Sequence, residues 1–86
     1  DLTAVTWSER LGRLLVIAES ADRLLVVTPE GAIDADEALP GGQQEGLALG
    51  PDGALWVADE RQGLLRFPGA EGALGAVLAA ETGAPR

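Results

Sequence analysis

The 86-residue sequence contains no Cys, no His and no Lys, and only 3% of its residues are aromatic. Without Cys, the chain can form neither a disulfide nor a thiolate-bound metal site. Without His, it has no imidazole general base, no zinc-type ligand set and no Ser-His-Asp or Cys-His catalytic arrangement. These absences favour a function other than catalysis for this chain by itself.

Charge and hydropathy argue against two further kinds of function, nucleic-acid binding and membrane insertion. The formal net charge is −8, and all six cations are Arg. Such a chain repels a phosphate backbone, so we expect no nucleic-acid binding, whereas cations or basic partners would be attracted. The longest apolar runs, such as Leu14 to Ala18, are far shorter than the roughly 18 to 20 residues of a membrane span, so we expect no membrane insertion.

Length and termini indicate a part of something larger. A chain of this size buries only about 60 to 65% of its unfolded surface, so a large hydrophobic core requires contacts with other segments or other chains. No signal peptide is recognisable, and the sequence does not begin with Met. We therefore interpret the chain as a fragment or a processed product, from which targeting information has been removed.

The segment from Gln44 to Phe67 predicts a meander of short strands. Its first strand ends at Gly50-Pro51-Asp52-Gly53, where Pro fixes φ, Asp bonds its own backbone and Gly tolerates positive φ, as in a hairpin turn. The return strand, Ala54 to Ala58, is apolar at successive positions, which indicates burial of both faces. A polar break at Asp59 to Gly63 precedes a third strand at Leu64 to Phe67.

The first half of the sequence repeats in the second half at a spacing near 41 residues. The aligned pairs are Gly12 to Val16 with Gly53 to Val57, Glu19 with Glu60, and Glu30 to Ile33 with Glu71 to Leu74, all at a shift of 41, together with Leu24-Leu25 and Leu64-Leu65 at a shift of 40, and Thr3 to Thr6 with Glu45 to Ala48 at a shift of 42. A period of this length, made of short strands and turns, is typical of a four-stranded propeller blade.

The sequence therefore predicts an all-β fold of two four-stranded antiparallel propeller blades, at residues 1–42 and 43–80, with a flexible tail at 81–86. Strands are expected at about residues 3–7, 13–18, 23–28, 32–39, 45–49, 54–58, 63–67 and 73–79. The segment from Ala73 to Ala80 is rich in Ala and Leu and has the composition of a short helix. The repeat nevertheless favours a strand there.

Two blades alone would leave apolar faces uncovered, because each face of a propeller blade packs on a neighbour. Roughly eight exposed apolar side chains, at about 1.5 to 3 kcal/mol each, correspond to a shortfall on the order of 12 to 24 kcal/mol. That equals or exceeds the ~5 to 15 kcal/mol net stability of an ordinary domain. We expect a larger propeller, for instance of six blades, completed by other blades of a longer parent chain or by copies of this chain in a ring.

Several segments carry a family resemblance: Asp1 to Trp7, Gly12 to Ser20, Arg23 to Leu25, Gln44 to Ala48 and Leu55 to Glu60. In this order they resemble the SdiA-regulated family of bacterial propellers, most closely its last two blades, over residues 1 to about 67. The resemblance implies a six-bladed propeller of poorly defined activity, often exported or membrane-anchored, with calcium as a plausible ligand. It thereby favours a periplasmic or extracellular location.

Other propeller families are similar over shorter stretches. The segment from Gly46 to Asp59 resembles blades of NHL repeats and of gluconolactonase-type lactonases. Asp59-Glu60 together with Leu64 to Pro68 resembles the calcium-dependent β-propeller phytases. The phytase resemblance would make Glu45 and Glu60 metal ligands in a phosphoester hydrolysis.

Four carboxylates are expected at one rim of the predicted blades. The start of a first strand and the end of the second lie at the same edge of a meander, so Glu45 shares an edge with Asp59 and Glu60. Glu19 takes the equivalent place one blade earlier. Calcium takes about six to eight oxygen ligands, so this cluster predicts a Ca²⁺ site. The alternative is an acidic rim that simply faces water.

Three functional hypotheses follow. The favoured one is a non-catalytic module that binds a small-molecule or protein ligand. The second is a fragment of a calcium-dependent phosphoesterase or lactonase whose remaining catalytic residues lie on other blades. The third is a half-propeller that assembles with itself into a homo-oligomer.

Overall fold

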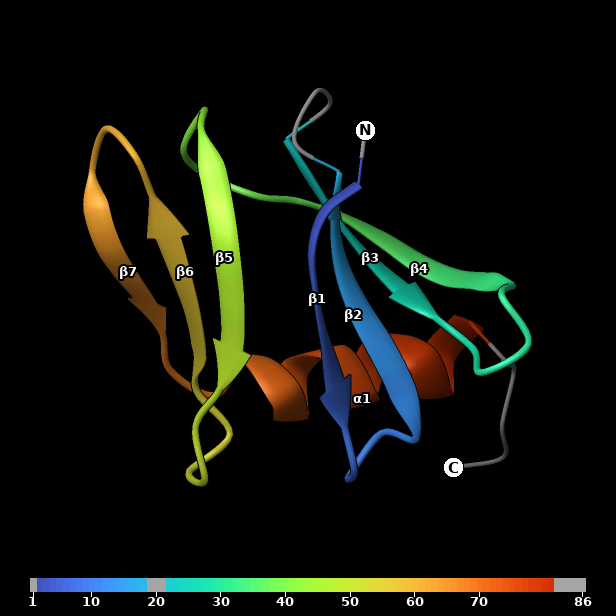
Figure 1. Ribbon diagram of the computed structural model, residues 1–86. Coiled ribbons are helices and arrows are strands. Elements are labelled where there is room, and N and C mark those ends of the chain that lie inside the picture. Colours follow the sequence, from blue (N-terminus) through green and yellow to red (C-terminus); the bar gives the residue numbers. More distant parts are fainter. Residues whose placement is uncertain (1, 19–21, 82–86) are drawn as a thin grey trace.

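The computed structural model describes residues 2–18 and 22–81, which form two antiparallel sheets and one helix (Figure 1). The first sheet contains four strands in sequence order: β1 (Leu2–Ser8), β2 (Arg13–Ala18), β3 (Arg23–Val27) and β4 (Ile33–Ala38). The second contains three: β5 (Gln44–Leu49), β6 (Leu55–Asp59) and β7 (Gly63–Phe67). The mostly β architecture is confirmed, and each end of these seven strands lies within one residue of its predicted position.

The eighth predicted strand, at residues 73–79, is wrong, because these residues belong to the helix α1 (Ala70–Glu81). Intrinsic propensity prevails here over the repeat, since Ala and Leu are strong helix formers. The helix also has an apolar face: Leu74 and Leu78 are buried, four residues apart, and Ala70 and Val77 pack beside them. The second sheet therefore has three strands instead of the four expected.

The two sheets meet along their first strands. Figure 1 shows β5 beside β1, with both arrowheads pointing to the same end of the molecule, although the two strands belong to separate sheets. Side chains alternate along a strand, so only one face of each sheet points toward the other. The core between these faces and α1 consists of Leu15, Ile17, Leu24, Val26, Ala35, Leu39, Leu55, Val57, Leu74 and Leu78.

The helix α1 contacts both sheets. Its Leu74 and Leu78 share the core cluster with side chains of β2, β3 and β6. Near its start, the Glu71 N–H donates to the Gly53 carbonyl oxygen at 3.1 Å, which fixes the helix to the turn between β5 and β6. The helix ends at Glu81, the first residue of the predicted tail, and residues 82–86 lie outside the described part of the chain. Within residues 2–18 and 22–81, no helix has the length and apolar character needed to cross a membrane.

Candidate functional site

Three of the four predicted carboxylates, Glu45, Asp59 and Glu60, lie at one edge, at the start of β5 and the end of β6. The register pairs Gln44 with Asp59, and the Glu60 N–H donates to the Gln43 carbonyl oxygen at 3.0 Å. The inference that these two strand ends share one edge is confirmed. Glu45 and Glu60 are both exposed at this edge, and Glu19 lies outside the described residues.

Asp59 is the most buried of the predicted carboxylates that the structure describes, and backbone N–H groups hold its side chain. Oδ1 accepts hydrogen bonds from the N–H groups of Arg61 at 2.9 Å and Gln62 at 3.0 Å. Oδ2 accepts from those of Gly42 and Gln43, both at 3.2 Å. The side chain, only 4% exposed, thus joins the loop before β5 to the turn after β6.

These hydrogen bonds favour the ionised form of Asp59. The Gln62 N–H makes the largest contribution, and those of Gly42, Arg61 and Gln43 add to it, so the pKa of this carboxyl is lowered although burial acts in the opposite direction. A cation that bound Asp59 would have to share oxygens that already accept two N–H groups each. The geometry therefore gives Asp59 a structural role at this edge.

A β-bulge decides which side chains of β5 point into the molecule. The register of β5 on β6 shifts between Gln44 and Gly46, so Glu45 is the extra residue. The alternation moves by one position there, and Gln44 faces the same side as Asp59 and Val57. Gln44 is accordingly fully buried, whereas Glu45 is exposed.

Sequence reasoning missed the burial of Gln44. Its Nε2 donates to the Pro40 carbonyl oxygen at 3.3 Å, and its Oε1 has no hydrogen-bond partner. The only signal of the bulge was Gly46, since a Gly inside a strand often marks one. Among the residues that the structure describes, no three His, Cys, Asp or Glu side chains are grouped so as to hold a metal ion. The calcium site at Glu19, Glu45, Asp59 and Glu60 stays a prediction.

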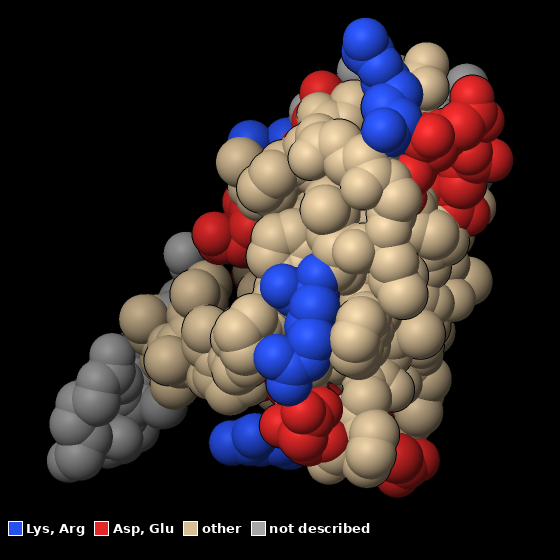
Figure 2. Space-filling model, turned by 90° about the vertical axis from the view of Figure 1, so that its left-hand side faces the viewer, with Lys and Arg blue, Asp and Glu red and all other residues tan. Residues whose placement is uncertain are grey.

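The outer face of the second sheet, turned away from the first sheet, consists of Gly46, Ala48, Trp56, Ala58, Leu64 and Arg66. Figure 2 views the molecule from the side on which β7 lies and shows that uncharged residues cover most of this surface. Arg66 lies over the Trp56 ring, 5.6 Å from its centroid, and forms a 2.7 Å ion pair with Asp52. Leu64 is 66% exposed.

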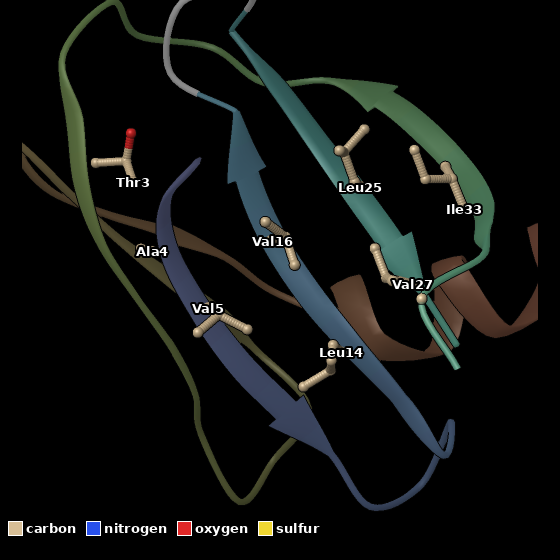
Figure 3. A pocket seen from close by; sticks show the side chains of 9 residues that line it. Thr3, Ala4, Val5, Leu14, Val16, Leu25, Val27 and Ile33 are labelled. Carbon is tan, nitrogen blue, oxygen red and sulfur yellow. The ribbon is translucent and has the colours of Figure 1, made fainter. Parts of the chain in front are cut away.

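The first sheet has an open apolar face, which we define by Val5, Leu14, Val16, Leu25, Val27 and Ile33. Figure 3 shows these side chains standing on one side of β1 to β4, while α1 passes behind the sheet. They line a shallow groove of about 550 Å³ together with Thr3, Ala4 and Gly31. Val5 is 59% exposed and Ile33 is 61% exposed, so the chain itself leaves this face largely uncovered.

No model of a known protein family matches the sequence, and no curated protein is significantly similar to it.

Proposed function

We propose that the chain is a two-sheet segment of a larger β-propeller, in which it acts as a non-catalytic module that binds a ligand or a partner. The observation that carries this proposal is the open apolar face of β1 to β4. Burial of apolar surface stabilises a protein by about 25 cal/mol per Å². A four-stranded sheet with one apolar face on the core and a second apolar face exposed therefore gains stability when another sheet covers it.

Two further observations support a propeller over other ways to cover the face. The two sheets are tandem repeats, and their first strands, β1 and β5, lie side by side in the same direction (Figure 1). Radially repeated sheets arranged in this way are the pattern of a propeller. The helix α1 departs from it, because a four-stranded second blade would place a strand beside β7. The proposal therefore rests chiefly on the first sheet, whose four strands are complete.

The resemblance to SdiA-regulated propellers agrees with this proposal and adds an acidic, calcium-binding rim to it. Glu45 and Glu60 are the exposed carboxylates at the edge where such a rim would lie. No described feature favours a phosphoesterase or lactonase over a binding module.

The test compares the wild-type chain with Val5→Glu. Because Val5 is 59% exposed, the substitution should not disturb folding of a single chain, as circular dichroism would verify. If the chain associates, light scattering should give a mass above 8.8 kDa, and Val5→Glu should reduce that mass. If the chain is a monomer, it should bind the dye ANS through the open face, and Val5→Glu should lose much of this binding. A monomer that binds no ANS, with a melting temperature unchanged by Val5→Glu, would overturn the proposal.

A further inference from the structure

The internal repeat relates the open face of the first sheet to the covered face of the second. A shift of 41 places Leu14 on Leu55 and Val16 on Val57, both of which are buried against the first sheet. A shift of 40 places Leu25 on Leu65, and a shift of 42 places Val5 on Leu47, both of which pack against the same core. The open face thus corresponds to a face that is already packed within the chain.

The reverse correspondence holds for the outer face of the second sheet. Its members Trp56 and Ala58 align with Leu15 and Ile17, which are fully buried between the sheets. Leu64 aligns with Leu24, which is also buried there. The outer face of β5 to β7 therefore corresponds to the face of β1 to β4 that packs on the second sheet.

These correspondences define a contact that joins two unlike surfaces. Within the chain, the inner face of the first sheet packs on the inner face of the second. The open face of the first sheet is the repeat equivalent of the inner face of the second sheet. The outer face of the second sheet is the repeat equivalent of the inner face of the first sheet. Such a head-to-tail contact, repeated between copies, closes into a ring or continues as a filament.

The charges on the two faces permit this contact although the chain carries a net charge of −8. Asp36, which lies opposite Leu25 of the open face, pairs with Arg23 at 2.6 Å, and Arg66 of the outer face pairs with Asp52 in the turn before β6 at 2.7 Å. Each of these two pairs is neutral, so neither would bring an unpaired charge into the contact. The Arg66 guanidinium also lies over Trp56, which keeps it against the sheet.

We propose that the outer face of β5 to β7 of a second copy of this chain covers the open face of β1 to β4, and that the contact repeats the internal packing of the two sheets. This inference rests on the proposed function, since it names the occupant of the same open face. It differs from a symmetric dimer, in which two open faces would pack on each other.

Charge insertion separates these arrangements. Leu64 is 66% exposed, so Leu64→Glu should leave a single chain folded, as Val5→Glu should. A carboxylate buried in an apolar contact is costly, so each variant should weaken association by about tenfold or more. Ala76→Glu, at an exposed position of α1, adds the same charge away from both faces and should leave the mass unchanged.

Cross-linking tests the geometry directly, because the chain has no Cys of its own. Val5→Cys and Leu64→Cys chains are mixed and treated with a short bismaleimide. We expect cross-linked dimers that contain one chain of each variant, and few from either variant alone. The head-to-tail contact would be overturned by cross-linked dimers that contain only Val5→Cys chains. It would also be overturned if Val5→Glu abolished association and Leu64→Glu did not. Either result would leave the proposed function unaffected. A monomeric wild-type chain would also overturn it, and ANS binding would then decide the proposed function separately.

Discussion

Ser8 Oγ donates a 2.6 Å hydrogen bond to Glu71 Oε2 and thereby joins the last residue of β1 to the first turn of α1. The Ser8 side chain is fully buried, and its hydroxyl also accepts a hydrogen bond from the Leu11 N–H at 3.1 Å. The two residues lie 63 positions apart in the sequence, so this contact fixes the helix to the first sheet.

Ser8→Ala should lower the free energy of unfolding by about 1 to 3 kcal/mol, because it leaves a partly buried carboxylate oxygen and a backbone N–H without this partner. Urea unfolding followed by circular dichroism measures the loss. Thr28→Ala is the matched control, since the Thr28 hydroxyl accepts from the Ala32 N–H at 2.9 Å in an exposed turn. Equal losses in the two variants would show that the contact between β1 and α1 adds nothing.

Asp59 should make the stability of the chain depend on pH in the acid range. Its folded-state pKa is lowered below the ordinary value, so the unfolded chain binds a proton more readily than the folded chain. The stability it contributes is fully present above an Asp pKa of about 3.9 and is lost as the pH falls through the lowered pKa.

Asp59→Asn should destabilise the chain at neutral pH and flatten the fall in stability below about pH 4. The amide can accept through one oxygen only, so it cannot replace a carboxylate that receives four N–H groups. Urea midpoints measured from pH 2 to pH 7 test both effects. Glu37→Gln removes one carboxylate charge at an exposed position and controls for net charge. Parallel pH curves for wild type and Asp59→Asn would contradict the structural role of this carboxylate.

Gly41 should tolerate no side chain. Its φ of 113° lies in a region that L-residues rarely adopt, and a Cβ at this position would lie 2.5 Å from Asp59 Oδ2. Gly41→Ala should therefore combine backbone strain with displacement of the Asp59 carboxylate. Gly12→Ala isolates the strain, because Gly12 has a φ of 62° and a Cβ there would meet no neighbouring atom within 4 Å.

We expect Gly12→Ala to cost about 1 to 2 kcal/mol, as for an L-residue in the left-handed region, and Gly41→Ala to cost more. Thermal or urea unfolding of the two variants provides the comparison. A smaller loss for Gly41→Ala than for Gly12→Ala would mean that the loop before β5 moves freely away from Asp59.

The sequence predicted the strands well because their signals are local. Turn clusters such as Gly50 to Gly53 and the tandem repeat together place all seven strands within one residue. The repeat failed at Ala73 to Ala80, where helix propensity and the spacing of Leu74 and Leu78 decide the structure. A sequence repeat therefore predicts the same secondary structure in both copies only where both copies have an amino-acid composition that favours that structure.

The candidate site was predictable only in outline. Antiparallel pairing was enough to place the start of β5 beside Asp59. Which side chains turn inward depends on the bulge at Glu45, and the four N–H groups around Asp59 depend on loop conformations. Neither follows from the period of a strand, so the burial of Gln44 and the N–H groups that hold Asp59 were both missed.

Calcium should stabilise the chain if the exposed carboxylates at this edge bind it. A ligand present at a hundred times its Kd stabilises the folded state by about 2.7 kcal/mol, which for a domain of this size raises the Tm by roughly 10 to 20 °C. Thermal melts in excess Ca²⁺ and in EDTA measure the shift, with Mg²⁺ as the control for ionic strength. Because the Asp59 oxygens are filled by N–H groups, the shift should depend on Glu45 and Glu60 and disappear in Glu60→Gln. Equal Tm values in Ca²⁺ and EDTA would remove calcium from the proposed function, whereas a shift that survives Glu60→Gln would place the ion elsewhere on the chain.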